Sequence, residues 1–348
     1  MSDTSALASP SHTSSPGLWT LAWRRFCRDR VGLVSFAIVL FFLAVTLASA
    51  ARLIAADWGT ETGVSYARPG FIGAEPITAL DASSPQVSSS PAQEAVAIED
   101  PLSEDLAQIR KELTGAAGTE SRAATLPLGG DKWGRDVLLK VIKGTETSLL
   151  VGLAAAFIAT FLGTVFGAQA GYFGGRVDDF FNWLYSVLTS IPYLLLILAI
   201  AAVLNQKGAL TVVLILGLTG WTGIFRLVRA EYMKHKVREY VRAADAIGAS
   251  NAQRMFVHIL PNVSHVVLVQ LSLHVVLFIK SEVILSFLGF GVGVDTVSWG
   301  SMLNEAQNEL LIGKWWQLAA ATLAMAVLVT SFSLFTDALR DSLDPRLK

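Results

Sequence analysis

Few residues in this sequence are arranged so that they could catalyse a reaction or hold a metal ion. Asp178 and Asp179 form its one pair of adjacent aspartates, and no third metal ligand lies near them. The five histidines lack H-E-x-x-H spacing, and the single cysteine, Cys27, excludes an internal disulfide. No G-x-x-x-x-G-K-[ST] phosphate loop occurs. We expect no catalytic residue, metal or cofactor in this chain, and we interpret Asp178–Asp179 as a helix start.

Two ionisable residues, Lys280 and Glu282, lie inside a long apolar run. Insertion scales assign a charged side chain at the centre of a membrane helix a cost of about 2.5–3.5 kcal/mol, so such residues are usually functional. Because the two are two positions apart, they point to different sides of a helix and do not pair. Both are candidates for a solute pathway or a subunit interface. The alternative is that both lie near the helix end and extend to the membrane surface.

The segment "REYVRAADAIGAS", residues 238–250, is a charged gap between two apolar runs. Its apolar positions recur at i, i+3, i+4 and i+7, which predicts a helix of about two turns with one apolar stripe: Tyr240, Ala243, Ala244 and Ile247. The small residues at the centre of this stripe would let another surface approach the backbone. The segment therefore suits a groove on a separate protein, or else it is a connector packed on its own helix ends.

The residues after this stripe predict how the helix ends. Gly248 can adopt the left-handed conformation that closes a helix, and Ser250 can cap a second one. We expect that second helix to break at Leu260 and Pro261, before the next apolar run.

The composition places the supporting elements in a membrane. The chain of 348 residues is 53% hydrophobic and 16% charged, whereas soluble domains average roughly 25% charged residues, and its mean hydropathy is +0.52. A pI of about 6.5 gives no indication of nucleic-acid binding. Roughly 20 apolar residues span a bilayer as a helix. The sequence contains six such runs, at Val31–Ile54, Thr147–Ala170, Phe180–Leu204, Leu210–Val228, Val263–Gly289 and Trp315–Leu339.

Basic residues predict the orientation of these runs. Arginine and lysine gather before the first run, in the charged gap and at the carboxyl end, which places both termini and the gap in the cytoplasm. "GLWTLAWRRFCRDR" predicts an interfacial amphipathic helix, although it could be only the positive flank of the first span. "ASA" at 48–50 resembles a signal-peptide cleavage site, but the first run is too long for that assignment. Pro192 should bend the third span, beside a pathway or merely easing packing.

The long segment between the first two runs differs in composition. Residues 57–126 are rich in Ala, Ser, Pro and Glu, and "DASSPQVSSSPAQEA" has no apolar period. "PLSEDLAQIRKEL" predicts one short helix. Otherwise the segment is expected to be irregular and acidic, and we interpret it as a solvated spacer rather than a binding element.

"YVRAADAIGASNAQRMFVHILPN" resembles the EAA loop of binding-protein-dependent ABC importer permeases. That pattern is Glu-Ala-Ala, three residues, Gly, nine residues, Ile, one residue and Leu-Pro, and it is matched by Ala243, Ala244, Gly248, Leu260 and Pro261. His258 stands in place of the Ile. Arg242 and Asp245 flank the alanines where the family usually has glutamate and arginine, so the two charges are exchanged. We expect them to pair across one turn, and a contact from the usual glutamate to the ATPase would need a changed partner.

Further stretches resemble the C-type permease subunit of dipeptide and oligopeptide importers. The overall resemblance covers nearly all of the chain outside 57–126, and six stretches carry it: "LGGDKWGRDVLLKVIKGTETSLLVGL", "GYFGGRVDD", "SIPYLLL", "SFLGFGV", "SWGSML" and "DALRDSLDPRLK". Glu282 matches the "E-x-x-L-S-F-L-G" stretch of such subunits, whereas Lys280 does not match the commoner pattern.

The resemblance implies an all-α integral membrane protein with six transmembrane helices of the type I ABC importer permease fold. It also implies an amino-terminal interfacial helix and a cytoplasmic coupling helix that docks on an ATPase, with seven coupling residues: Tyr240, Arg242, Ala243, Ala244, Asp245, Ile247 and Gly248. The expected partners are a second related permease, two ATPase subunits that bind ATP and Mg²⁺, a periplasmic substrate-binding protein and membrane lipid. The expected location is the bacterial inner membrane.

The chain divides on this basis into five parts. They are a cytoplasmic tail and interfacial helix at 1–30, the first span at 31–54, a periplasmic loop with the acidic insertion at 55–143, a five-helix transmembrane domain at 144–340 with its coupling loop at 229–262, and a cytoplasmic tail at 341–348.

Three other functions are weighed against a peptide importer. A secondary transporter would usually show inverted repeats and ion sites within its spans, and no internal repeat is evident. A membrane-embedded enzyme would need a metal or acid pair beyond Asp178–Asp179. A permease of the same family could carry nickel complexes or another non-peptide solute, and the sequence does not name the solute.

Overall fold

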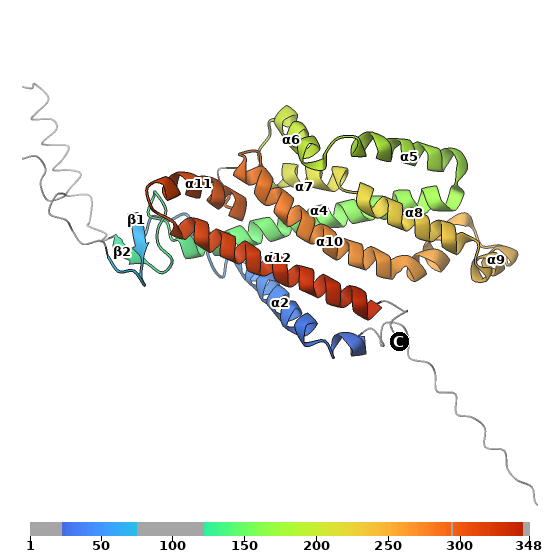
Figure 1. The fold of residues 1–348 in the computed structure, drawn as a ribbon, viewed down its shortest axis with the longest axis horizontal. Helices are drawn as coiled ribbons and strands as arrows, with labels where there is room; N and C mark the ends of the chain where they lie inside the picture. The colour runs from blue at the N-terminus through green and yellow to red at the C-terminus, as the bar shows by residue number, and fades with distance from the viewer. Residues whose placement is uncertain (1–22, 75–121, 294, 344–348) are drawn as a thin grey trace, which may run out of the picture.

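The structure is a computed structural model that describes residues 23–74, 122–293 and 295–343. Helices dominate these residues, together with one small parallel sheet (Figure 1). The elements in chain order are α2 (Arg30–Ala50), β1 (Gly63–Pro69), β2 (Ala123–Leu126), α4 (Val137–Phe173), α5 (Gly175–Thr189), α6 (Tyr193–Leu204), α7 (Ala209–Thr219), α8 (Thr222–Lys236), α9 (Glu239–Ala246), the π-helix η1 (Gln253–Ile259), α10 (Leu260–Phe287), α11 (Trp299–Leu311) and α12 (Trp316–Leu343).

The prediction of six spans agrees with these helices. Five helical runs are long and apolar enough to cross a membrane, namely α2, α4, α7–α8, η1–α10 and α12. The pair α5–α6 provides a sixth if it is counted as one broken span. The first described residues and the end of α12 lie toward the end of the bundle that carries α9, and β1 and β2 lie at the opposite end (Figure 1). The start of α2 and the end of α12 therefore lie toward the same end of the bundle as α9 (Figure 1).

The break between α5 and α6 is sharper than the expected bend at Pro192. The two helices meet at 84°. Pro192 has an extended ψ of 128° and acts as the N-cap of α6, because a proline disfavours helical geometry in the residue before it and offers no N–H. Just before the break, the hydroxyls of Thr189 and Ser190 donate to carbonyls of the preceding turn, at 2.8 and 2.7 Å. These bonds satisfy backbone acceptors where the helix ends.

Helix α4 forms the centre of the bundle and packs closely against α8. Gly163, Gly167 and Gly171 recur every four residues on the contact face. A Cβ at Gly163 would lie 2.2 Å from Cγ2 of Ile224, and one at Gly171 would lie 2.5 Å from the carbonyl oxygen of Arg229. Small residues of this kind allow helix backbones to approach in lipid, where the hydrophobic effect does not drive association.

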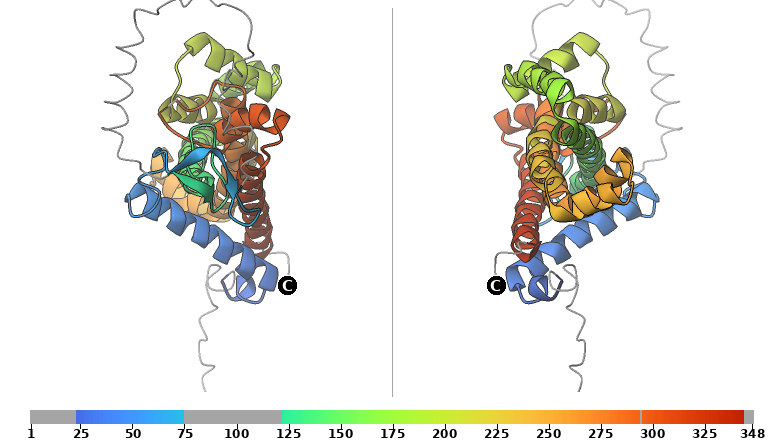
Figure 2. Two further views of the ribbon diagram at one scale, coloured as in Figure 1. Left: turned by 90° about the vertical axis from the view of Figure 1, so that its left-hand side faces the viewer. Right: turned by 90° about the vertical axis from the view of Figure 1, so that its right-hand side faces the viewer.

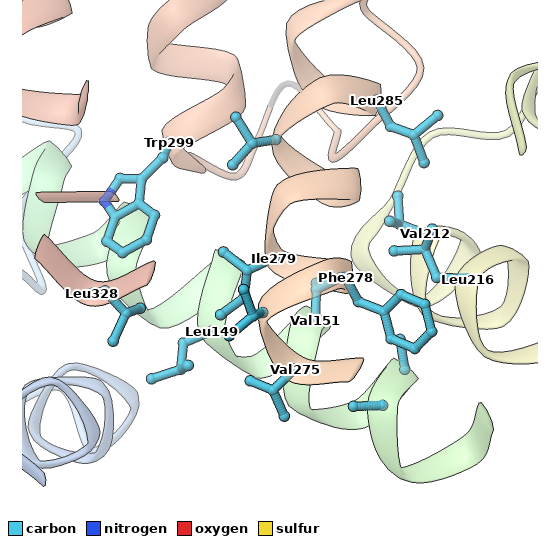
Figure 3. Close-up of a cluster of buried hydrophobic side chains, with 14 of the residues drawn as sticks. Leu149, Val151, Val212, Leu216, Val275, Phe278, Ile279, Leu285, Trp299 and Leu328 are labelled. Carbon is cyan, nitrogen blue, oxygen red and sulfur yellow. The ribbon is translucent and has the colours of Figure 1, made fainter. Parts of the chain in front are cut away.

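The main apolar core lies where α4, α7, α10, α11 and α12 meet (Figure 3). Leu149, Leu216, Phe278 and Trp299 are among its fully buried side chains. Helices α2 and α12 pack together on one side of the bundle, and α5 and α6 lie on the opposite side (Figure 2).

Several elements differ from the sequence predictions. Leu260 and Pro261 do not break the chain, because η1 and α10 form one helical run from Gln253 to Phe287, with Pro261 in the first turn of α10. The π-helix changes the backbone hydrogen-bonding register just before the proline, which lets the run continue without the missing N–H. The sequence analysis also missed α11 and the sheet. The parallel pairing of β1 with β2 orders both flanks of the segment expected to be irregular.

The amino-terminal helix is described only over residues 23–26. Phe26 is 4% exposed and packs edge-on against Phe36 and Phe335, so this residue faces protein rather than lipid. The rest of the predicted interfacial helix and the short helix predicted at 101–113 lie outside the described residues.

Candidate functional site

The charged gap folds into α9, which lies at one end of the bundle between α8 and η1 (Figure 1). Arg238 has the extended conformation of an N-cap residue, with φ −71° and ψ 149°. Only two residues, Val237 and Arg238, lie between the end of α8 and the start of α9. The helix is therefore held between two elements that run back into the membrane bundle.

The apolar stripe predicted for α9 is wrong in one respect. Ala244 is 5% exposed and lies with Val241 on the face that packs into the subunit. Val241 on this inner face belongs to a core cluster with Tyr232, Met255 and Ile259. The helical spacing of apolar residues does not distinguish this inner face from the predicted stripe, because Val241 and Ala244 are also three positions apart.

The other members of the predicted stripe remain on the outside. Tyr240 is 38% exposed, Ile247 is 84% exposed, and Ala243 is also exposed. We call Tyr240, Ala243 and Ile247 the outer face of α9. A helix that exposes an isoleucine and an alanine beside a tyrosine offers a small apolar surface to a second protein.

The carboxyl end of α9 closes as expected at Gly248. This residue has φ +87°, where a side chain would strain the backbone. The N–H of Ala249 donates to the carbonyl of Ala244 at 3.0 Å, and the N–H of Gly248 donates to that of Asp245 at 2.9 Å. These two bonds form a Schellman motif. Ser250 and Gln253 then bond reciprocally, as in a capping box, and begin the next helix.

The expected pair between Arg242 and Asp245 does not form. Asp245 instead accepts from the guanidinium of Arg254 on η1. Arg254 also donates to Asn251 Oδ1 at 2.7 Å, which accepts from the Tyr172 hydroxyl at 3.0 Å. This network joins α9 to η1 and α4, while Arg242 is exposed.

Asp245 pairs with Arg254 rather than with Arg242 because of the geometry of the loop. Asp245 lies near the end of α9, and the turn at Gly248 brings η1 back beside it. Arg254 is nine positions away in sequence, so the helical i, i+3 rule could not identify it. Its side chain is 19% exposed, compared with 63% for Asp245. Asp245 therefore pairs within the loop, whereas Arg242 and Glu239 are both exposed on α9.

Comparison with known proteins assigns this fold to a family. Residues 149–348 match the family model described as the binding-protein-dependent transport system inner membrane component. The chain belongs to that family. Residues 17–60 match the N-terminal transmembrane domain of oligopeptide transport permease C. The chain is thus a transmembrane permease subunit of the ABC importer class.

Three curated relatives support the assignment. The dipeptide transport system permease protein DppC of Bacillus subtilis is 37% identical over 220 residues, covering 63% of this chain and 68% of the relative. The oligopeptide transport system permease protein OppC of Haemophilus influenzae is 35% identical over 218 residues, covering 63% and 70%. The di/tripeptide transport system permease protein DppC of Pseudomonas aeruginosa is 35% identical over 236 residues, covering 68% and 77%.

Glu282 lies inside this permease and does not face lipid. Its side chain is fully buried on α10, and one carboxylate oxygen accepts from the Ser286 hydroxyl at 2.7 Å. Helix α11 packs directly beside it, because a Cβ at Gly300 would lie 2.5 Å from the carbonyl oxygen of Val283. Lys280 is exposed on another side of α10, as the spacing predicted.

A second polar cluster lies at the end of the permease away from α9, and the sequence analysis missed it. Lys140 on α4 is 1% exposed and donates to Asp131, Glu305 and Gln317, at 2.9, 2.7 and 3.1 Å. Burial opposes ionisation of Asp131, but Lys140 and Arg135 hold its pKa below the ordinary value. The cluster ties the loop after β2 to α4, α11 and α12.

Asp178 is a structural residue in this permease. It lies in the first turn of α5, as its interpretation as a helix start required. Its carboxylate accepts from both Nε and Nη2 of Arg229 on α8, at 2.5 and 2.6 Å, and from Asn182 at 2.7 Å. Over the ranges that the structure describes, no group of three or more His, Cys, Asp or Glu residues could hold a metal ion.

Proposed function

We propose that this permease forms one half of the translocation pathway for peptides or peptide-like solutes in an ATP-driven importer. A second related permease supplies the other half, and two ATPase subunits bind ATP and Mg²⁺. A periplasmic substrate-binding protein delivers the solute. Support for the solute class comes from the relatives, which are named as dipeptide, di/tripeptide and oligopeptide permeases. We also propose a bacterial inner-membrane location with both termini in the cytoplasm.

The observation that carries this proposal is the rigid mounting of α9. The inner face of α9 is buried in the subunit, its end is closed at Gly248, and Asp245 is tied to Arg254. An ATPase subunit that binds the outer face would therefore displace α9 as a unit rather than unfold it.

The helices on either side of α9 provide the mechanical connection. The run η1–α10 contains 35 residues and is therefore roughly 50 Å long at about 1.5 Å per residue. It begins beside α9 and carries Glu282 near its far end, next to α11. Closure of the ATPase pair would move this lever, and the transporter would alternate between inward and outward openings as a shift in population. Pro192, Lys280 and Glu282 remain our candidates for the pathway or the subunit interface.

The test is uptake of a labelled dipeptide by proteoliposomes that contain the assembled transporter. We expect uptake only when both permeases, the ATPase subunits, the binding protein and ATP are present. Uptake that proceeds without the ATPase and follows an ion gradient would show a secondary transporter instead. Reporter fusions at positions 91 and 346 should report opposite sides of the membrane, and identical sides would refute the topology.

A further inference from the structure

A cavity of about 520 Å³ opens between α5 and α8, away from α9 and from the cluster around Lys140, and its mainly apolar wall carries one cation. One cation and several small or polar side chains line it, which leaves room for a ligand: Tyr185, Thr222, Gly223, Arg226, Leu227 and Ala230. Most of these residues share one face of α8, since Gly223, Arg226, Leu227 and Ala230 are at i, i+3, i+4 and i+7.

Arg226 projects at this cavity without a carboxylate partner among the described residues. Its guanidinium donates to the Tyr185 hydroxyl at 3.3 Å and lies 5.7 Å from the centre of that ring. Arg229, one turn further along α8, is instead paired with a carboxylate, because its Nε and Nη2 both donate to Asp178. An arginine carries five N–H donors in a planar fork, so most of those on Arg226 are available to a ligand.

Polar side chains of α10 lie near Gly223, which is one of the residues that line the cavity. Gly223 has no side chain, and a Cβ at that position would first meet His274 Nε2 at 3.7 Å and Gln270 Nε2 at 3.9 Å, both on α10. The other nitrogen of His274 is bonded to the Thr160 hydroxyl at 2.9 Å. Arg226 is thus the one cation among the residues that line the cavity, and the side chains near Gly223 add polar nitrogen atoms.

The position of Arg226 makes a lipid-facing role unfavourable. It lies on the helical run Ala209–Lys236, which is one of the membrane-span candidates. A cation on a span is costly unless it meets water or an anion, so such residues mark pathways by default. A planar guanidinium matches the two oxygens of a carboxylate particularly well.

We propose that this cavity binds the carboxylate of the solute during translocation, with Arg226 as its main contact and Tyr185 orienting the guanidinium from below. This proposal rests on the proposed function, because a peptide supplies one carboxylate at its C-terminus whatever its side chains are. It makes a free C-terminus a feature that the permease itself recognises, separately from recognition by the delivery protein.

The test compares alanyl-alanine with its C-terminal amide in proteoliposomes that contain the complete transporter. Arg226→Gln should lower the maximal uptake rate of the free acid about tenfold or more, because a charge-assisted contact is lost. The KM should stay within about twofold, since the delivery protein sets it, and amide uptake should equal that of the wild type. Arg226→Lys should recover part of the free-acid rate. Lys234→Gln is the matched control, because Lys234 lies on the same helix but pairs with Glu231 outside the cavity.

Two results would overturn the carboxylate site while leaving the proposed function intact. In one, Arg226→Gln slows acid and amide uptake equally, which would mean that Arg226 holds the subunit interface or drives conformational change. In the other, Arg226→Gln transports both solutes at wild-type rates. The proposed function itself fails if the wild-type transporter takes up neither peptide above the level of empty liposomes.

Discussion

Tryptophan substitutions at two neighbouring alanines separate the inner face of α9 from its outer face. Ala244 is buried against the subunit, whereas Ala243 is exposed. Ala244→Trp forces an indole into a buried position on the inner face of α9, the face whose Val241 belongs to the cluster around Tyr232. Overpacking of this kind costs about 1–3 kcal/mol. Ala243→Trp adds bulk only on the outside, where substitutions usually change stability by less than about 0.5 kcal/mol.

The assay is hydrogen exchange of the backbone amides in residues 239–250, combined with copurification of the ATPase. A loss of 1–3 kcal/mol in local stability corresponds to roughly 5- to 150-fold faster exchange. We expect that acceleration in Ala244→Trp alone. Ala243→Trp should show wild-type exchange and yet lose the ATPase and transport.

Two outcomes would refute this assignment of faces. Normal copurification and transport by Ala243→Trp would show that the outer face of α9 is not the docking surface. Wild-type exchange in Ala244→Trp would show that the packing around this residue is loose enough to accept an indole.

Two further predictions concern stability. Gly163→Ala should lower the thermal midpoint of the detergent-solubilised permease, because its Cβ would lie 2.2 Å from Ile224 at the α4–α8 contact. Gly223→Ala is the control and should leave the midpoint unchanged, because the nearest atom to its Cβ would be 3.7 Å away. Equal midpoints for the two variants would contradict the close packing of α4 against α8. Burial raises the pKa of Glu309 to about 7, against the opposing charge of Lys140, so the folded state keeps a proton that the unfolded state loses near pH 4.5. The free energy of unfolding should therefore fall as pH rises from about 4.5 to 7, and Glu309→Gln should abolish that part of the pH dependence. The same dependence of stability on pH in Glu309→Gln and in the wild type would contradict this role of Glu309.

The membrane spans could be predicted from sequence because their signal is local. Length and hydropathy identify each long helix. Helix α11 was missed because its 13 residues are too few for a span and carry polar side chains throughout. The break at Pro192 was expected, but its angle of 84° depends on how α5 and α6 pack against their neighbours.

For α9, the sequence predicts how the helix ends but not all of its tertiary contacts. Gly248 and Ser250 follow local rules of helix termination, and both were predicted correctly. The burial of Ala244 and the pairing of Asp245 with Arg254 depend on the return of η1, which no local pattern encodes. The buried contacts of Lys140 likewise join residues up to 177 positions apart.

Site-directed cross-linking tests the central claim most directly, because it asks which surface of this permease meets the ATPase. With Cys27, the single native cysteine, replaced by serine, Ile247→Cys and Leu311→Cys place one thiol at each end of the bundle at matched exposures of 84% and 85%. In the assembled transporter, a short bifunctional thiol reagent should join Ile247→Cys to an ATPase subunit bearing a cysteine in its docking cleft, in a yield that changes with ATP. Leu311→Cys should give no such product. Equal cross-linking from both positions, or none from Ile247→Cys in a transporter that still imports peptide, would contradict the role of α9.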